Sequence, residues 1–494
     1  MMPSVERCLD GLPIRLRDRV HCLNDRPLGQ GRYVLCWLQQ VLRADENPLI
    51  DAAVHLGNAL DLPVLVYHGI SQRYPHASDR LHAMLLGGSR DVARGCARRG
   101  LRMASHVVRP GHVEKGLVYR LAAEAALTVC EDHPTFVARW QSVSLAAGSD
   151  RAVLAVDAAR LVPIRVLPDG LKTTPAFRKA SGALRDDHLV PDASPDPACP
   201  PYEGDLPFAP DPLADATEDD LRALIAACDI DHSLPVCEDY PPRRAVALER
   251  MAAFMDTHLA RYKWTRNNPA AAGSGSELSP YLHFGFIAPW EVAQAVKRAD
   301  VHAAARWKFL DELLTWREWF HYRALHTPRF ERFESLPDRP RDSLLAHAGD
   351  PRDTVYTLDE LLHGRTDDET WNAAQKQWLL TGYMHNNLRM YWGKKLIGWT
   401  PDPETAWNVA CYINDRISLD GRDPATYGNM RWCFGDAKPA YREQPVYGWV
   451  APKSDRALRK RAGASDWLAD MAGRDVPRIA APNAWPGPPA SGGG

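Results

Sequence analysis

The pattern of apolar residues changes near residue 165, and this change limits the folds that the chain can adopt. Before it, amphipathic segments separate five short apolar runs, at 33–38, 62–69, 102–108, 126–131 and 152–157. Strand and helix in alternation predict a parallel sheet that is covered on both faces. From about Asp219 onward, nearly every segment has helical periodicity instead. The chain should therefore combine an α/β domain with an all-helical domain.

The boundaries of these domains follow from composition. Between the two patterns the chain is crowded with Pro and Asp and lacks periodicity, most clearly at 191–212, which is typical of a linker. The end of the chain is rich in Pro, Gly, Ala and Ser, a composition that favours disorder. We therefore predict an N-terminal extension at 1–18, a Rossmann-like α/β domain at 19–165, an interdomain linker at 166–218, an all-α domain at 219–470 and a disordered tail at 471–494.

The charge and cysteine content of the 494 residues narrows the possible environments. The formal net charge is -2, so a polyanion such as DNA would have to meet a local basic patch. The ten cysteines form no CxxC pair and show no zinc-ligand spacing, which favours free thiols in a reducing compartment and predicts no metal site. No apolar run reaches the roughly 18 to 20 residues of a membrane span. We therefore expect a cytoplasmic protein that contacts no membrane.

A Gly/Ser loop precedes a predicted helix in GSGSELSPYLHFG (273–285). Its backbone amides can approach a phosphate closely, and Ser279-Pro280 fits an N-cap and the first helical position. Phosphate oxygens at a helix start meet free N–H groups and the positive end of the dipole. Such loops are also common as plain connections, so the motif alone leaves both interpretations open.

Glu312 and Trp316 lie four residues apart in a segment with helical periodicity, so they should share a face. A carboxylate beside an indole can bind a nucleobase, because the acid accepts N–H groups while the ring stacks on the base. The alternative is a helix with a solvated Glu and a half-buried Trp.

Four tryptophans stand in two pairs, Trp371 with Trp378 and Trp392 with Trp399, each seven residues apart. Seven residues are almost two helical turns, so the indoles should fall near one longitudinal stripe. Core packing is the common role of such a stripe. The alternative is a chain of one-electron carriers, since indole can be oxidised to a radical. That role requires a redox cofactor at one end and solvent at the other.

The segment INDRISLDGRDP (413–424) places three aspartates and two arginines around one glycine. Such clusters are usually solvated. In the alternative interpretation, Asp420 pairs with Arg389 in a buried polar wall.

Together these segments resemble the class II cyclobutane pyrimidine dimer photolyases of the photolyase/cryptochrome superfamily. The resemblance runs from about Arg19 to Trp449 and includes, in the family's order, RVHCLNDRPLGQGRYVLCWLQQVLRADENP, NNPAAAGSGSELSPYLHFG, MHNNLRMYWGKKLIGW and INDRISLDGRDP. It implies an α/β domain that can hold an antenna chromophore, a deazaflavin or another, and a helical domain that binds FAD, active as FADH-. It also implies a monomer that acts on UV-damaged DNA.

The resemblance assigns roles around the flavin. It implies contacts to the FAD phosphates from Ser276, Leu278 and Ser279, contacts to the isoalloxazine from Arg389 and Asp420, and a contact to its N5 edge from Asn414. The tryptophans resemble the family's electron-transfer triad, with Trp392 nearest the flavin and Trp371 and Trp399 leading outward. Trp378 is then expected to serve packing.

On the lesion side, the resemblance implies that Glu312 bonds the thymine edge, and that Trp316, Met390 and Trp432 form the apolar walls. Here the chain departs from the family. It reads GDAKPAY where the family has Gly-Ile-His-Asp-x-x-Trp, so Tyr441 replaces a pocket tryptophan and Ala437-Lys438 replaces the His-Asp pair. Flavin binding is therefore a firmer expectation than dimer repair.

The leading hypothesis is a light-driven DNA lyase. Excited FADH- would donate an electron to a flipped-out pyrimidine dimer, the cyclobutane ring would split, and the electron would return. One alternative is a cryptochrome-like blue-light photoreceptor without repair. Another is a photolyase for a different lesion such as the (6-4) photoproduct, for which His385 is the candidate proton donor. A binding module without cofactor would not explain the loop, the Asp/Arg wall and the tryptophans together.

Overall fold

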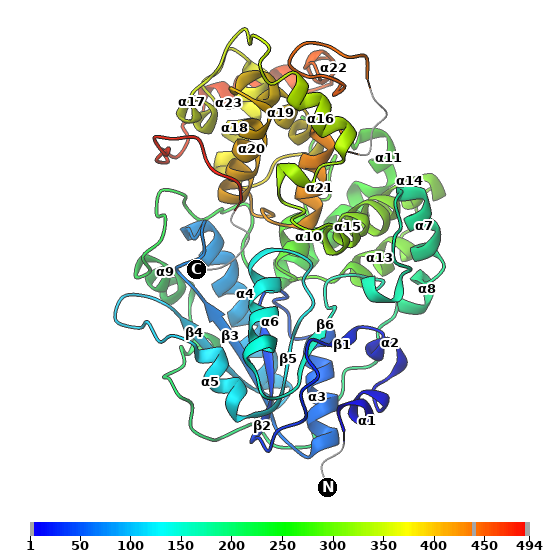
Figure 1. Ribbon diagram of the computed structural model, residues 1–494, viewed down its shortest axis with the longest axis vertical. Helices are drawn as coiled ribbons and strands as arrows, with labels where there is room; N and C mark the ends of the chain where they lie inside the picture. The colour runs from blue at the N-terminus through cyan, green and yellow to red at the C-terminus, as the bar shows by residue number, and fades with distance from the viewer. Residues whose placement is uncertain (1–3, 437–440, 490–494) are drawn as a thin grey trace.

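The computed structural model describes residues 4–436 and 441–489. Its N-terminal part contains a six-stranded sheet in the order β1-β6-β5-β2-β3-β4 (Figure 1). The strands pair in parallel, apart from β1, which is antiparallel to β6. They are β1 (Val20–Cys22), β2 (Tyr33–Leu38), β3 (Val64–Ile70), β4 (Arg102–Val107), β5 (Ala125–Glu131) and β6 (Val153–Val156). The five apolar runs are β2 to β6, so the α/β prediction is confirmed.

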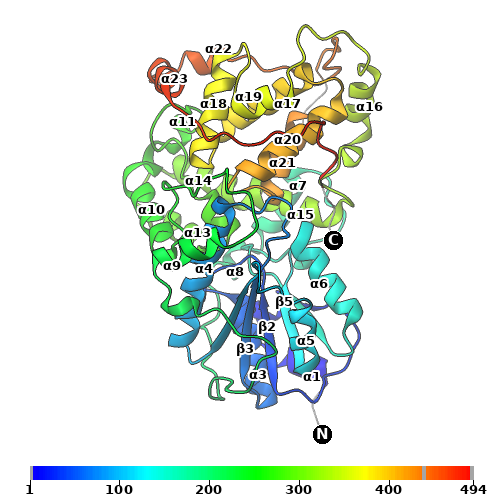
Figure 2. The ribbon, with the colours of Figure 1, turned by 90° about the vertical axis from the view of Figure 1, so that its left-hand side faces the viewer.

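Helices cover both faces of this sheet (Figure 2). Along β2, Val34 and Cys36 pack into one core cluster with α3 and α4, whereas Leu35 and Trp37 pack into another with α5 and α6. Because β2 is buried on both sides, its sequence is continuously apolar instead of alternating. The helices are α3 (Pro48–Leu60), α4 (Asp79–Arg98), α5 (Leu117–Glu124) and α6 (Phe136–Gly148), with α1 (Val5–Asp10) and α2 (Ile14–Arg17) before the sheet.

The C-terminal part is built from helices, as predicted. None of the helices in the described residues has the length and apolarity to cross a membrane. The bounds are α10 (Arg244–Thr257), α11 (Tyr262–Thr265), α12 (Ser279–His283), α13 (Pro289–Arg298), α14 (Ala303–Asp311), α15 (Glu318–His326), α16 (Asp338–Ala346), α17 (Leu358–His363), α18 (Glu369–Thr381), α19 (Asn386–Trp399), α20 (Pro403–Ile417), α21 (Pro424–Cys433), α22 (Arg456–Arg459) and α23 (Ala464–Gly473).

The segment between the domains differs from the predicted linker. It contains two helices, α7 (Thr174–Gly182) and α8 (Arg185–His188), before the extended chain begins. Arg178 of α7 pairs with Asp311 at 2.9 Å, which holds α7 against the helical domain. The next helix, α9 (Glu218–Ala226), packs on α4 and therefore belongs with the sheet. Periodicity predicts that a helix forms, but it does not identify the partner of its apolar face.

The start of the tail also differs from the prediction of disorder at 471–494. α23 extends to Gly473, and the chain beyond it lies on the helical domain. Ile479 is 2% exposed, and its N–H donates to His363 Nε2 at 3.3 Å. The carbonyl of Ala480 accepts a hydrogen bond from Arg416 at 2.7 Å. One buried isoleucine can anchor a segment whose composition otherwise favours disorder. Residues 490–494 lie outside the described residues.

Buried charged side chains join the two domains. Arg80 of α4 donates to the carbonyls of Leu379 and Ile417, at 2.5 and 2.8 Å. From the helical domain, Glu318 of α15 accepts a hydrogen bond from the backbone N–H of Leu161, at 2.6 Å. These bonds satisfy donors of the Arg80 guanidinium and one oxygen of Glu318, groups that would be costly to bury alone. They fix the helical domain against the carboxyl-terminal edge of the sheet.

Glu318 should make the stability of the protein depend on pH. Burial raises its pKa to about 7, from an ordinary value of 4.5. Between these two pH values the unfolded chain has released a proton that the folded chain still holds, so this group lowers stability as pH rises through that window. A Glu318→Gln variant, which keeps the acceptor for Leu161, should therefore gain up to about 3 kcal/mol at pH 8 and much less at pH 5. Urea unfolding at both pH values measures this difference, and an equal gain at both would refute the assignment.

Candidate active site

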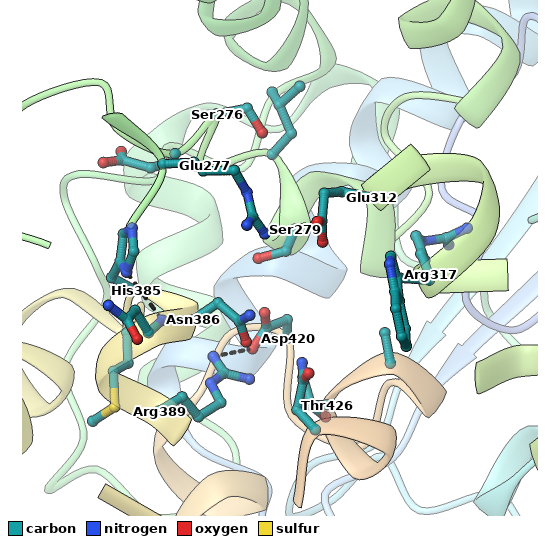
Figure 3. Close-up of a pocket in the computed structure, with 18 of the residues that line it drawn as sticks. Ser276, Glu277, Ser279, Glu312, Arg317, His385, Asn386, Arg389, Asp420 and Thr426 are labelled. Atoms are coloured by element: carbon teal, nitrogen blue, oxygen red, sulfur yellow. Dashed lines mark hydrogen bonds and ion pairs between the residues drawn. The ribbon is translucent and has the colours of Figure 1, made fainter. Parts of the chain in front are cut away.

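A cavity of about 600 Å³ opens in the helical domain (Figure 3). The loop before α12, the segment joining α14 to α15, and helices α19 and α21 contribute its walls. Volumes of this order are typical of cofactor sites. Nine of the predicted site residues line it: Ser276, Leu278, Ser279, Glu312, Trp316, Arg389, Met390, Asp420 and Trp432. Segments more than 100 residues apart in sequence thus meet at one site.

The Gly/Ser loop forms one wall of the cavity through backbone geometry. Gly273 has φ +67°, and a Cβ at this position would lie 2.3 Å from the ring of His258, so only glycine fits. Glu277 also has a positive φ, of 54°, and its carboxylate is held by Arg250 at 2.6 Å. The helix cap is Leu278, one residue before the predicted Ser279, and no side chain caps the helix start. The backbone N–H groups there remain available to a ligand.

A buried ion pair forms the floor. Arg389 Nη2 lies 3.0 Å from Asp420 Oδ1, and both side chains are less than a tenth exposed. Ser418 Oγ donates to the same carboxylate oxygen at 2.5 Å. The guanidinium carbon of Arg389 lies 5.2 Å from the ring centroid of Trp378. Arg389 Nε has no hydrogen-bond partner among the described residues. A cation held in this way is oriented by its neighbours and retains a donor for a ligand.

Asn414 does not line the cavity, which is a correction to its predicted place at the flavin edge. Its side chain is fully buried behind Arg389, whose Nη1 donates to Asn414 Oδ1 at 3.5 Å. Its amide donates to Asp415 and to Thr426 Oγ. On this side, Ala425, Thr426 and Asn429 of α21 reach the cavity instead. Asn414 lies near the end of α20, and the sequence motif could not show which way that helix turns its amide.

Glu312 occupies a π-helical turn, Glu312–Arg317, between α14 and α15, where the periodicity predicted an uninterrupted α-helix. The wider turn lets both Trp316 and Arg317 line the cavity. The carboxylate of Glu312 is 2.7 Å from Arg266 Nη2 and 2.5 Å from Lys308 Nζ. Its side chain is 26% exposed. Two cations thus fix the position of this carboxylate.

Tyr441, the described end of the altered segment, does not line the cavity as predicted. Tyr441 was expected to form a pocket wall, but it is 53% exposed and is not a lining residue. Its N–H instead donates to the carbonyl of Trp449 at 3.0 Å. Asp436, just before the segment, is held by Arg431 and Arg323 at 2.8 Å each. The Ala437-Lys438 replacement lies outside the described residues.

Sequence reasoning missed most of the charged groups in the walls. Among the described residues, six cations and four carboxylates line the cavity: Arg266, Lys308, Arg317, Arg389, Lys394 and Lys453, with Glu277, Glu312, Asp420 and Asp423. The excess of cations favours an anionic ligand although the whole chain is nearly neutral. His385 also lines the cavity, and burial lowers its pKa to about 4. This histidine is therefore neutral at physiological pH.

The tryptophans form a ladder behind the ion pair. Trp378 meets Trp392 edge-on, with ring centroids 5.2 Å apart. Trp392 stacks on Trp371 at 5.8 Å and an interplanar angle of 9°, and Trp371 meets Trp399 edge-on at 5.4 Å. The first three indoles are fully buried, whereas Trp399 is partly exposed. The ladder therefore leads from the side of Arg389 toward the surface.

Comparisons with known proteins agree with this architecture. A scan against protein-family models finds no match. A deoxyribodipyrimidine photo-lyase of Methanothermobacter thermautotrophicus is 30% identical over 467 residues, which cover 92% of this chain and 98% of the relative. Two solved structures share the fold. A class III photolyase from Agrobacterium tumefaciens has a TM-score of 0.64 and 19% identity, and the match covers 90% of this chain and 87% of that one. A cryptochrome from Synechocystis has a TM-score of 0.63 and 18% identity, and the match covers 89% of each chain. The near full-length relative and the shared fold establish that the chain belongs to the photolyase/cryptochrome family.

Proposed function

We propose that the protein binds FAD in this cavity and uses light to repair cyclobutane pyrimidine dimers in DNA. One observation carries the proposal: a single cavity is walled by the Arg389–Asp420 pair on one side and by Glu312 and Trp316 on the other. A cofactor and a flipped-out base can therefore meet there. The name of the archaeal relative, deoxyribodipyrimidine photo-lyase, agrees with this reaction.

The residues present fit a flavin. The donor Nε of Arg389 lacks a partner among the described residues, and Ser276 and Ser279 of the loop line the same cavity. We assign the phosphates to this loop and the ring system to the Arg389–Asp420 pair. When bound, FAD supplies light absorption and the transfer of a single electron.

The chain's own side chains prepare the lesion side. Arg266 and Lys308 hold the carboxylate of Glu312 in place, so its oxygens can accept N–H groups of a thymine edge. Trp316, Trp432 and Met390 offer apolar surface on which an extruded dimer can stack. Lys453 and the other lining cations favour contact with the DNA backbone.

The finer assignments follow from the sequence resemblance. We propose that the chain is of class II, because the quoted motifs resemble that class, and that its α/β domain can hold an antenna chromophore. We also propose a cytoplasmic monomer. All ten cysteines are free, in keeping with a reducing compartment.

A (6-4) photolyase fits the cavity less well. That reaction was expected to use His385 as a proton donor. The lowered pKa of His385 leaves it neutral near pH 7, and its Nδ1 accepts the N–H of Asn387 at 3.1 Å. A neutral imidazole is a weak acid in this role, so we favour cyclobutane dimers.

Glu312→Ala tests the lesion side of the proposal. Loss of one charged acceptor should cost about 1.5–3 kcal/mol of dimer binding, which corresponds to roughly 10- to 100-fold lower affinity for UV-damaged oligothymidine. The flavin content should stay unchanged. Binding is measured by fluorescence anisotropy in the dark, and repair by recovery of thymine absorbance in blue light.

The matched control is Glu291→Gln. Glu291 also pairs with an arginine, Arg244, at 2.7 Å, but it does not line the cavity. This variant should bind and repair as the wild type does. If Glu312→Ala loses flavin and repair together, Glu312 does not act on the lesion.

A further inference from the structure

A second cluster of polar side chains lies outside the cavity. It stands at the carboxyl end of β4, which is an edge strand of the sheet (Figure 1). His106 is the penultimate residue of β4, and His112 and Glu114 follow in the loop before α5. One ring nitrogen from each histidine and one carboxylate oxygen lie within 4.8 Å of one another. His106 Nε2 is 3.3 Å from Glu114 Oε2, and His112 Nδ1 is 3.9 Å from the same oxygen.

The cluster leaves buried polar atoms without partners. His106 is 1% exposed, and neither of its ring nitrogens makes a hydrogen bond to any described residue. Glu114 Oε2 is also buried and unbonded, although the Glu114 side chain as a whole is 34% exposed. Orphaned groups of this kind are rare in folded proteins and call for an explanation. A cation between the two histidines and the carboxylate would satisfy all three.

A further carboxylate stands behind the cluster and can orient one ligand. Asp211, in the extended chain after α8, has its Oδ2 3.6 Å from His112 Nε2, the nitrogen that faces away from Glu114. Asp211 is itself fixed, because its Oδ2 accepts the N–H of Val107 at 2.7 Å and its Oδ1 pairs with Arg109 at 2.9 Å. A carboxylate behind a histidine that faces a metal is the usual support of such ligands.

We propose that His106, His112 and Glu114 bind a divalent cation of the zinc class, with water completing a four-coordinate site. Bonds of about 2.0–2.2 Å place tetrahedral ligands roughly 3.3–3.6 Å apart, close to the separations of 3.3 and 3.9 Å found here. Two imidazoles and one carboxylate suit Zn²⁺, whereas Mg²⁺ and Ca²⁺ prefer oxygen ligands alone. The sequence predicted no metal site because its ten cysteines lack zinc-ligand spacing, whereas the ligands proposed here are two histidines and a glutamate.

The bound cation would tie the loop at 108–116 to β4 and, through Asp211, to the extended chain that joins the two domains. The proposed metal site is separate from the flavin cavity, because neither its three ligands nor Asp211 lines that cavity. The competing explanation is a metal-free contact between His106 and Glu114.

The test is zinc uptake by the full-length protein after treatment with a chelator. Zinc is titrated at pH 7.5 against a chromophoric chelator, and thermal unfolding is followed with and without the metal. The wild type should take up one zinc per chain and unfold at a higher temperature when loaded. Because His106 is buried, His112→Ala and Glu114→Gln are the variants of choice, and each should lower the affinity at least tenfold. Asp211→Asn should lower it roughly 10- to 100-fold.

His347→Ala is the matched control. His347 also lies between two carboxylates, but its two nitrogens bond them separately, Asp350 at 2.6 Å and Glu443 at 3.3 Å, so they do not converge. This variant should bind zinc as the wild type does. The proposal is overturned if the wild type takes up no zinc, if a His112→Ala/Glu114→Gln double variant takes up as much, or if Mg²⁺ competes equally.

Discussion

Arg389→Ala should purify without flavin and should lose about 3–5 kcal/mol of stability. The reason is the buried pair itself. Without Arg389, the carboxylate of Asp420 stays buried and keeps Ser418 as its one side-chain partner among the described residues, and the donor assigned to the flavin ring is gone. Flavin content is read from the visible spectrum, and stability from urea unfolding.

Arg416→Ala separates these two effects. Arg416, near the end of α20, pairs with Asp231 at 2.8 Å and does not line the cavity. Its loss should lower stability while the flavin is retained. If Arg389→Ala keeps a full complement of flavin, the cavity assignment is wrong.

Trp392→Phe should slow light-driven reduction of the bound flavin at least tenfold, equivalent to about 1.4 kcal/mol of barrier. Trp392 stacks on Trp371, and its Nε1 donates to Gln375 Oε1 at 2.9 Å, an acceptor that stabilises an oxidised indole. Phenylalanine preserves the packing but cannot be oxidised in the same way. The measurement is the rate of flavin bleaching in blue light with an external reductant.

Two further variants make this test specific. Trp407 is equally buried, but it lies outside the ladder, where its Nε1 donates to the carbonyl of Glu331. The flavin of Trp407→Phe should therefore bleach at the wild-type rate. Trp378 lies beside the Arg389 cation, and its Nε1 has no acceptor among the described residues. Both features disfavour a positive charge on its ring, so Trp378→Phe should have little effect. Normal bleaching in Trp392→Phe would exclude the ladder as the electron path.

The strands of the sheet could be predicted because burial on both faces leaves uninterrupted apolar runs such as 33–38. The packing partner of a helix or tail segment was harder to predict than the segment itself. The apolar face of α9 fits α4 as well as it would fit another helix, and nothing local in its sequence distinguishes the two. The anchoring of the tail depends on Ile479 and on the distant His363, a contact that composition cannot reveal.

Within the site, the motifs predicted several residues that line the cavity. Ser276 and Ser279 of the Gly/Ser loop are examples, and the Arg389–Asp420 pair, one of two interpretations of its segment, is present. The place of Asn414 behind the wall depends on how α20 meets α21, and the wider turn at Glu312 is a π-helical feature that α-helical spacing does not anticipate. The expected role of Tyr441 rested on the resemblance to a family segment, and this chain has different residues there.

Light-dependent repair tests the central claim most directly. The reduced protein is mixed with UV-damaged oligothymidine, and thymine absorbance is followed in blue light and in the dark. The proposed function predicts recovery only in the light, and a loss of this recovery in Arg389→Ala. No recovery from a protein whose flavin still photoreduces would contradict dimer repair and would favour the photoreceptor.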